Sequence, residues 1–482
     1  MEQFIKTIGL GITVLSSSGI VTTAQEKPNI LWIVADDLGP DAGCFGTENV
    51  RTPNIDKLAY DGIRFTQLHA VVPVCSPSRS SLITGMYPVS VNCHQHRTRN
   101  KTALPGTVLP VTEYFRQAGY YVSNGDGTRP GRPGKTDYNF AFDKPFFDGV
   151  DWSGRKQGQP FFAQMQIHFP HRPFKTDPVH PVNRQALTIP PVYPDHPLTR
   201  EDWAQYLESV QQVDHYVGRI MERLEKDSLL HNTIVFFFGD QGRPMVRAKQ
   251  FLYDEGTHTP LIIRFPDERK AGSHVDDLLS TVDIPATSLL LAGISLPEHI
   301  QGQDIFSGNK REYVFSSRDR MDETVDRIRS VRNRRLKFIR NYYPARPYTQ
   351  FNTYKVTMYP VLTLMKVLYK RGKLTPGQAA FMSPVRPKEE LYDLTNDPFE
   401  MENLSADPDY AADLEHMRRA LDEWVARNDK GVYPEDREEI DYWAKDAEQA
   451  FQKKMDSYQL PADISDEEFL RWWEGRLKAE QQ

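Results

Sequence analysis

Two pairs of polar residues follow apolar runs and could together hold a cation. Asp36 and Asp37 come directly after the run PNILWIVA, and Asp240 and Gln241 come directly after the run TIVFFFG. Adjacent carboxylates in an apolar setting repel each other, and a hard divalent cation with oxygen ligands removes that repulsion. The amide oxygen of Gln241 also suits such a cation. The alternative for an isolated Asp-Asp pair is a turn in contact with water.

Two histidines, a cysteine and an arginine offer further chemistry. The segment HFPH places His168 and His171 at the end of a third apolar run, PFFAQMQI. Histidine, with an unperturbed pKa of about 6.5, can donate or accept a proton near neutral pH. In the segment CSPSR, Arg79 lies one turn along a helix predicted to begin after Pro77, so its guanidinium could orient a group at position 75. By itself, Cys75 would most often be an inert core residue.

The segment VCSPSRSSLITG, residues 74–85, closely resembles the signature of type I sulfatases, and other motifs of that family follow in order to about residue 404. The resemblance implies that Cys75 is oxidised to formylglycine (3-oxoalanine) by a formylglycine-generating enzyme or an anaerobic sulfatase-maturating enzyme. The hydrated aldehyde would attack sulfur, with Arg79 beside it. The resemblance also implies a Ca²⁺ ion held by five positions, of which the last more commonly carries Asn or His: Asp36, Asp37, residue 75, Asp240 and Gln241.

The same resemblance assigns roles to other polar residues. His171 would protonate the departing alcohol, with His168 behind it or in contact with sulfate. Lys249 would grip the sulfate. Lys135 matches the first member of the family's Gly-Lys-x-His segment, but Asp137 stands where the family has His and could instead face a sugar hydroxyl.

Alternating strand and helix patterns predict the elements that carry these residues. The three apolar runs are typical of strands buried on both faces of a parallel sheet, whose carboxyl ends are where open α/β sheets bind ligands. Apolar residues recur at helical spacing from Trp203 to Leu224, and residues 111–119 predict a shorter helix ending at Gly119. The pattern predicts an α/β sandwich. The resemblance implies an alkaline-phosphatase-like fold with a large mixed, mainly parallel sheet.

The pattern changes after about residue 310. Short strand patterns separated by polar turns predict a smaller C-terminal α+β subdomain with an antiparallel sheet at residues 311–430, after a catalytic domain at residues 25–310. Residues 431–482 predict a helical acidic tail, in which Ser465 and Glu468 form a capping box for the last helix.

The N-terminus and the cysteines bear on the compartment. Residues 1–24 combine a weakly basic start, a short apolar run and small residues, a pattern typical of a signal peptide, with a buried helix as the alternative. The apolar run is too short to span a membrane. We therefore expect an exported protein, periplasmic or secreted. Three cysteines in 482 residues argue against a disulfide scaffold, and Cys44 and Cys93 could pair or stay free.

Charge limits the classes of ligand. A net charge of −6 creates no global positive field for nucleic acid or an acidic membrane. Residues 318–346, however, contain ten Arg or Lys against four acids, and form either a solvated face with internal ion pairs or an anion-binding surface led by Arg318 and Arg320. Similarly, His94 and His96 either line the substrate entrance or lie in a solvated loop.

Segments in this basic stretch resemble bacterial polysaccharide sulfatases, which implies a sulfated polysaccharide or its oligosaccharides as substrate, either algal, such as ulvan, or a glycosaminoglycan. Two rival hypotheses remain. One is a phosphate or phosphonate ester hydrolase of the same superfamily, and the other is a secreted carbohydrate-binding protein with an inactive site.

Overall fold

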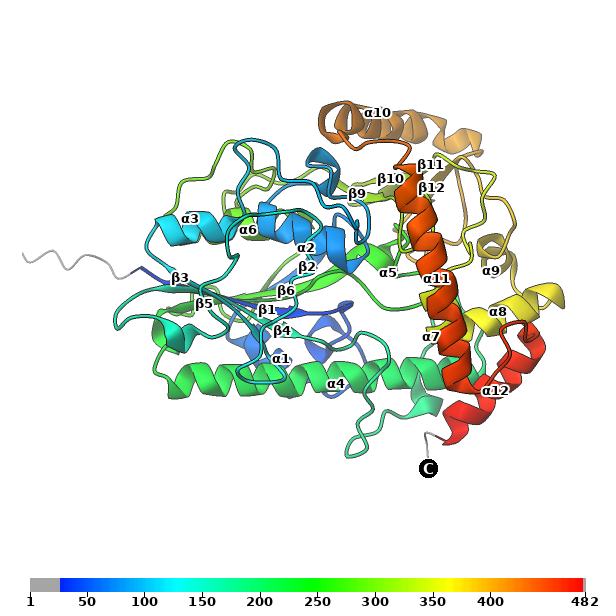
Figure 1. Ribbon diagram of the computed structural model, residues 1–482, viewed down its shortest axis with the longest axis horizontal. Helices are drawn as coiled ribbons and strands as arrows, with labels where there is room; N and C mark the ends of the chain where they lie inside the picture. Colours follow the sequence, from blue (N-terminus) through cyan, green and yellow to red (C-terminus); the bar gives the residue numbers. More distant parts are fainter. Residues whose placement is uncertain (1–26, 480–482) are drawn as a thin grey trace, which may run out of the picture.

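The core of the protein is an eight-stranded sheet. The computed structural model describes residues 27–479, so the predicted signal peptide lies outside the described residues (Figure 1). The strands are ordered β3-β4-β1-β5-β6-β2-β7, with β8 also paired to β2. Only β6 runs antiparallel to its neighbours in this sheet. The strands are β1 (Asn29–Ala35), β2 (Ile63–His69), β3 (Tyr121–Asp126), β4 (Phe161–Ile167), β5 (Thr233–Gly239), β6 (His258–Arg264), β7 (Ser273–Val275) and β8 (Leu279–Ser280).

Both faces of the sheet are apolar because helices cover both. Along β1, Leu31 and Ile33 join one hydrophobic core while Trp32 and Val34 join another on the opposite face, as the period of two in a strand requires. Figure 1 shows the two layers of helices on either side of the sheet. One layer contains α1 (Pro53–Tyr60) and α4 (Pro197–Lys226), and the other contains α2 (Cys75–Thr84), α3 (Val111–Gln117) and α6 (Asp283–Leu291).

A second sheet of four antiparallel strands follows, in the order β12-β11-β10-β9. Its strands are β9 (Val314–Arg318), β10 (Ile328–Arg332), β11 (Leu336–Asn341) and β12 (Glu389–Asp393). Val331 and Phe338 of this sheet share a core with Leu414 and Leu421 of α10 (Ala411–Asn428). The predicted α/β sandwich, with a mainly parallel large sheet and a smaller antiparallel one, is confirmed, and it is the arrangement expected of an alkaline-phosphatase-like fold.

The remaining helices pack at the end of the large sheet where its parallel strands finish (Figure 1). They are α5 (Asp254–Thr257), α7 (Thr353–Met358), α8 (Pro360–Lys370), α9 (Pro376–Phe381), α11 (Arg437–Tyr458) and α12 (Asp466–Ala479). The predicted capping box is present before α12, because Ser465 Oγ accepts a bond from the backbone N–H of Glu468 while Glu468 accepts one from the N–H of Ser465. Within residues 27–479, no helix combines the length and apolar character needed to cross a bilayer.

Candidate active site

Three neighbouring parallel strands end at the same level. Ala35 at the end of β1 pairs in register with Ile167 of β4 and with Gly239 of β5. The next residue in each chain segment is polar, and Asp36 and Asp240 are thereby placed side by side. The register confirms that these strands deliver polar groups to one edge of the sheet.

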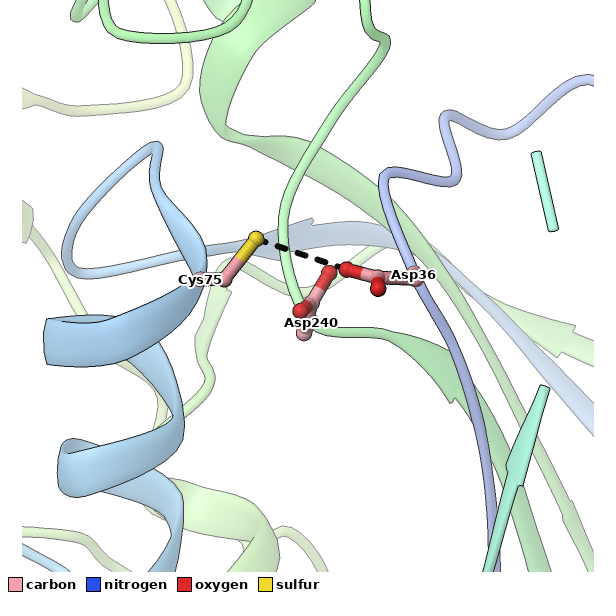
Figure 2. A group of neighbouring side chains, drawn as sticks. All are labelled: Asp36, Cys75 and Asp240. Atoms are coloured by element: carbon pink, nitrogen blue, oxygen red, sulfur yellow. Dashed lines mark hydrogen bonds between the residues drawn. The ribbon is translucent and has the colours of Figure 1, made fainter. Parts of the chain in front are cut away.

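Cys75 meets this edge from α2, of which it is the first residue. Its thiol is buried, at 2% exposure. Sγ lies 3.4 Å from Asp36 Oδ1 and 3.8 Å from Asp37 Oδ1. One ligand atom from each of Asp36, Cys75 and Asp240 falls within 4.8 Å of the other two, and Figure 2 shows the three side chains converging. The N-terminus of α2 also brings a partial positive charge to this point.

Each of the three buried carboxylates beside Cys75 is paired with its own cation. Lys135 Nζ lies 2.7 Å from Asp36 Oδ2, Lys249 Nζ lies 2.6 Å from Asp37 Oδ2, and Arg79 Nε lies 2.9 Å from Asp240 Oδ2. Burial alone would raise the pKa of Asp36, but the charges of Lys135 and Arg79 hold it well below its ordinary value. Burial raises the pKa of Asp240 to about 7 despite the charge of Arg79, so the six side chains form a charge-balanced cluster in the state in which all three carboxylates are ionised.

Local backbone features position two of these cations. Gly134, which precedes Lys135, packs so tightly that an added Cβ would lie 2.5 Å from Gly125 O, so the loop can approach β3 only with glycine there. The loop that carries Lys249 is tied to the segment before α2, because Gln250 N–H donates to Pro73 O over 2.8 Å. Lys249 Nζ consequently lies 3.6 Å from Cys75 Sγ.

The unmodified thiol is poorly suited to nucleophilic attack. Burial, reinforced by the negative charge of Asp36, raises the pKa of Cys75 to about 12. Since the thiolate is the reactive form of cysteine, only a trace would be ionised at neutral pH. Burial and the charge of Asp36 would also disfavour an ionised hydroxyl at this position, so a hydroxyl-bearing group would need a metal or another activating partner.

Gln241 lies where a fourth or fifth metal ligand would be expected. Its side-chain nitrogen contacts Asp37 Oδ1 and lies 3.3 Å from Cys75 Sγ, while its Oε1 is buried without a hydrogen-bond partner. Amide nitrogen and oxygen occupy equivalent positions when the amide turns by half a rotation. The oxygen can therefore face the carboxylates when a cation is bound between them.

His171 is oriented for proton transfer at one nitrogen. Its Nδ1 lies 2.6 Å from Arg172 O, which can only accept, so Nδ1 carries the proton in the neutral ring. Nε2 then remains available, 3.9 Å from Asp37 Oδ2. Burial and the charge of Lys249 lower the pKa of His171. His168, in contrast, is 37% exposed on its side chain and contacts Asp126, with Nε2 3.1 Å from Oδ2.

A cavity of about 380 Å³ opens over Cys75, His171 and Lys249. Among the sequence-predicted substrate residues, His96 lies in its wall, with Nδ1 2.8 Å from Asp322 Oδ1. Asp137 lies behind the wall and holds Arg97, which lines the cavity, through two contacts of 3.2 and 3.1 Å. Asp137 therefore positions the guanidinium of Arg97 at the cavity and does not line the cavity itself.

Three sequence-predicted substrate residues lie away from the cavity. Arg318 and Arg320 are both 1% exposed. Arg318 lies 3.8 Å from Asp326 and packs over Phe251, while Arg320 pairs with Glu435 at 2.6 Å. His94 is buried against the ring of Tyr433. None of these three side chains lines the cavity, because their polar groups are enclosed by protein, so a substrate contact by any of them stays a prediction.

The cysteines outside the cluster are unpaired. Cys44 and Cys93 are both free, which resolves the alternative that the sequence left open. Burial raises the pKa of Cys93 to about 12 and, together with the charge of Asp56, raises that of Cys44 to about 12.

Several cavity residues were not predicted. Tyr354 packs beside His171 with ring centroids 5.7 Å apart, and Lys249 lies 5.2 Å from the same tyrosine ring. The opposite wall comes from α11, through Trp443, Asp446, Ala447, Ala450 and Lys454. Tyr354 carries no sequence signal of its own. The α11 residues recur at helical spacing, so the sequence predicts that they share one face of a helix. It does not predict that this face lines a cavity.

Comparison with known proteins agrees with this geometry. The Sulfatase family model matches residues 28–294, and the model for the C-terminal region of N-sulphoglucosamine sulphohydrolase matches residues 245–361. An ulvan-active sulfatase of Formosa agariphila is 33% identical over 466 residues, in an alignment that covers 85% of this chain and 77% of that protein.

Solved structures share the fold at low identity. A protein in complex with its substrate D-glucosamine-2-N,6-O-disulfate superposes with a TM-score of 0.61 at 19% identity, covering 83% of this chain and 98% of that chain. A phosphonate monoester hydrolase from Silicibacter pomeroyi superposes with a TM-score of 0.60, also at 19% identity, covering 83% and 96%. The fold alone therefore does not separate these activities. The Sulfatase model, however, matches more than half of the chain, and the chain belongs to the sulfatase family of sulfuric ester hydrolases.

Proposed function

We propose that this sulfatase removes sulfate from a sulfated polysaccharide or its oligosaccharides, in the cavity above residue 75. The observation that carries the proposal is the balance of three carboxylates against three cations in the cluster. A bound divalent cation would raise the net charge to +2. An ionised nucleophile and a sulfate monoester, each with one negative charge, would return it to zero. A phosphate monoester carries about −1.5 to −2 near neutral pH and would leave the cluster negative.

The donor set supports Ca²⁺ as the cation. Asp36, Asp37, Asp240 and the amide oxygen of Gln241 are hard oxygen donors, the kind that Ca²⁺ prefers. The buried, unpartnered Oε1 of Gln241 is a group that a cation would satisfy. When bound, the ion would stabilise the ionised form of a hydroxyl at residue 75.

Conversion of Cys75 to formylglycine completes the proposed site. The hydrated aldehyde supplies two hydroxyls on one carbon at the position where Sγ now contacts Asp36 and Asp37. The raised pKa of the thiol supports the need for this conversion. A formylglycine-generating enzyme or an anaerobic sulfatase-maturating enzyme would be the partner, and the pattern of residues 1–24 supports export to the periplasm or beyond.

The chain's own side chains have distinct roles in the proposed reaction. In its protonated, imidazolium form His171 carries a second proton at Nε2 for the departing alcohol oxygen, while Nδ1–H donates to Arg172 O and fixes the ring. Lys249 and Lys135 neutralise the sulfate oxygens, and each is already held within 2.7 Å of a carboxylate. Arg79 orients residue 75 through Asp240 and through a 2.7 Å bond to Gln166 Oε1.

The substrate class rests on the relatives and on the cavity. The similar Formosa agariphila protein is described as ulvan-active. The cavity of about 380 Å³ is large enough for a saccharide ring. Its lining mixes charged groups with the aromatic rings of Tyr354 and Trp443, which suits a polar, ring-shaped ligand.

Two measurements test the proposal together. Mass spectrometry of the peptide containing residue 75 should show an oxygen in place of one sulfur and two hydrogens. The purified protein should then release sulfate from an aryl sulfate and from defined sulfated oligosaccharides of ulvan and glycosaminoglycan type, with far slower turnover of the matching aryl phosphate. Faster turnover of the phosphate would favour the phosphate or phosphonate hydrolase. An unmodified thiol with no turnover would favour the inactive carbohydrate-binding protein.

A further inference from the structure

Part of the cavity wall comes from α11, the helix before the last one of the chain. Trp443, Ala447, Ala450 and Lys454 recur every three or four residues and so lie on one face of the helix. This face spans about 16 Å at 1.5 Å per residue. The matches to the two family models end at residue 361, so α11 is a feature of this chain beyond the part that those models describe.

Contacts within α11 and with neighbouring segments hold this helix in place. Glu439 accepts bonds from Arg99 N–H at 2.6 Å and from Trp443 Nε1–H at 2.8 Å. Thr353 Oγ1–H donates to Ala447 O at 3.1 Å, and the ring of Phe451 packs edge-on against Phe351 with centroids 5.3 Å apart. The wall is therefore a fixed part of the cavity.

The groups on this wall differ from those around residue 75. Ala447 and Ala450 leave space beside the cavity, since neither side chain extends beyond one carbon. Asp446 is exposed in the cavity and can accept hydrogen bonds from hydroxyls. Lys454 is half-buried, with Nζ 4.9 Å from the centroid of the Tyr458 ring, and within residues 27–479 no carboxylate lies within ion-pair distance of it.

Lys454 also lies in a positively charged environment. Burial and the neighbouring charge of Arg476 on α12 lower the pKa of Lys454. A partly buried cation that has no carboxylate partner and lies close to a second cation is destabilised, and an anionic ligand would relieve both effects. The sulfate that reacts is assigned to Lys135 and Lys249 in the cluster around residue 75, so the group at Lys454 would be a different one.

We propose that α11 binds the saccharide part of the substrate, and that Lys454 pairs with a second anionic group of that saccharide, either a uronic acid carboxylate or a further sulfate. The inference rests on the proposed function and extends it to the chemistry of the leaving group. It predicts that the enzyme prefers sulfated saccharides with a second negative charge.

The test compares matched substrates. One disaccharide carries a sulfate ester and a uronic acid carboxylate, a second carries the same sulfate with the carboxylate reduced to an alcohol, and a third carries an additional sulfate in place of the carboxylate. We expect the wild-type kcat/KM to be roughly tenfold higher for the charged disaccharides. In Lys454→Gln this preference should disappear, mainly through a rise in KM for the charged disaccharides. The charged disaccharide whose kcat/KM falls more in Lys454→Gln identifies whether Lys454 pairs with a carboxylate or with a sulfate.

Matched variants on the same helix control for folding. Lys453→Gln changes an exposed lysine outside the cavity lining and should leave all rates unchanged. Ala450→Trp should fill part of the cavity and lower saccharide turnover at least tenfold, whereas Ala444→Trp, on an exposed face outside the lining, should leave it unchanged.

The outcomes separate the two proposals. Equal rates for charged and neutral disaccharides in the wild type, or a preference that survives in Lys454→Gln, would overturn the role of Lys454. Failure of the wild type on every sulfate ester would contradict the proposed function instead. Calorimetry on the Cys75→Ala variant, with and without Lys454→Gln, measures the Kd of each disaccharide without turnover. Tighter binding of the charged disaccharides that is lost in Lys454→Gln would support the inference, and equal Kd values would overturn it.

Discussion

Replacement of His171 by glutamine tests the proposed proton transfer most directly. The glutamine amide can still donate to Arg172 O, which His171 Nδ1 contacts at 2.6 Å, but it has no acidic proton to give. Because His171 makes one hydrogen bond with its side chain and is partly exposed, the free energy of unfolding should fall by only about 1 kcal/mol.

The expected loss depends on the leaving group. A sugar alcohol is a poor leaving group without protonation, and a positioned general acid typically contributes about 10²- to 10⁴-fold. At 1.36 kcal/mol per tenfold change, this corresponds to roughly 3–5 kcal/mol of transition-state stabilisation. An acidic nitrophenol can depart as its anion, so its sulfate ester should lose less than about tenfold.

The assay measures kcat for both substrates in the wild type, in His171→Gln and in His168→Gln. His168 contacts Asp126 and lies outside the cavity lining, so its replacement should cost less than about tenfold with either substrate. Equal losses for nitrophenyl sulfate and sugar sulfate in His171→Gln would refute the reasoning. That result would mean that His171 binds the sulfate or residue 75 rather than protonating the alcohol.

Three further changes have defined outcomes. Cys75→Ala should abolish sulfate release without unfolding the protein, as followed by ion chromatography and circular dichroism, because the side chain is a small buried group. Chelation should abolish activity and lower Tm, and Ca²⁺ should restore both, since an ion that binds only the folded state stabilises it; unchanged activity after exhaustive chelation would contradict the metal site. Arg320→Leu should cost about 3–5 kcal/mol of unfolding free energy by leaving Glu435 without its partner, yet leave KM unchanged in the folded fraction. A large rise in KM for the sulfated substrate in Arg320→Leu would show that Arg320 contributes to substrate binding.

The strand ends could be predicted because local sequence determines them. The runs before Asp36 and Asp240 carry no polar side chain after Asn29 and Thr233, as a strand buried on both faces requires, and parallel neighbours must end at one edge. Register then follows from pairing, which places Ala35 opposite Gly239. That Cys75 lies at this edge could be predicted only from its motif, because a cysteine by itself does not indicate such a position.

Partners that are distant in sequence could not be predicted. The basic composition around Arg320 gives no sign that Glu435, 115 residues later, buries its charge. Asp137 departs from the family pattern in sequence, but its bond to Arg97 depends on how two loops meet. Likewise, the tail helix α11 has an amphipathic pattern that predicts a buried face without predicting that a cavity lies against part of it.

The burial of Cys75 has a consequence for the order of events in the life of the chain. An enzyme that modifies this residue must enclose its side chain, but in the folded protein Cys75 is 2% exposed and forms the first turn of α2. Strands β5 and β6, which close the sheet around it, are encoded more than 150 residues later. The proposed conversion of Cys75 to formylglycine would therefore compete in time with the completion of folding. A chain that folds before it is modified would be stable, correctly shaped and permanently inactive.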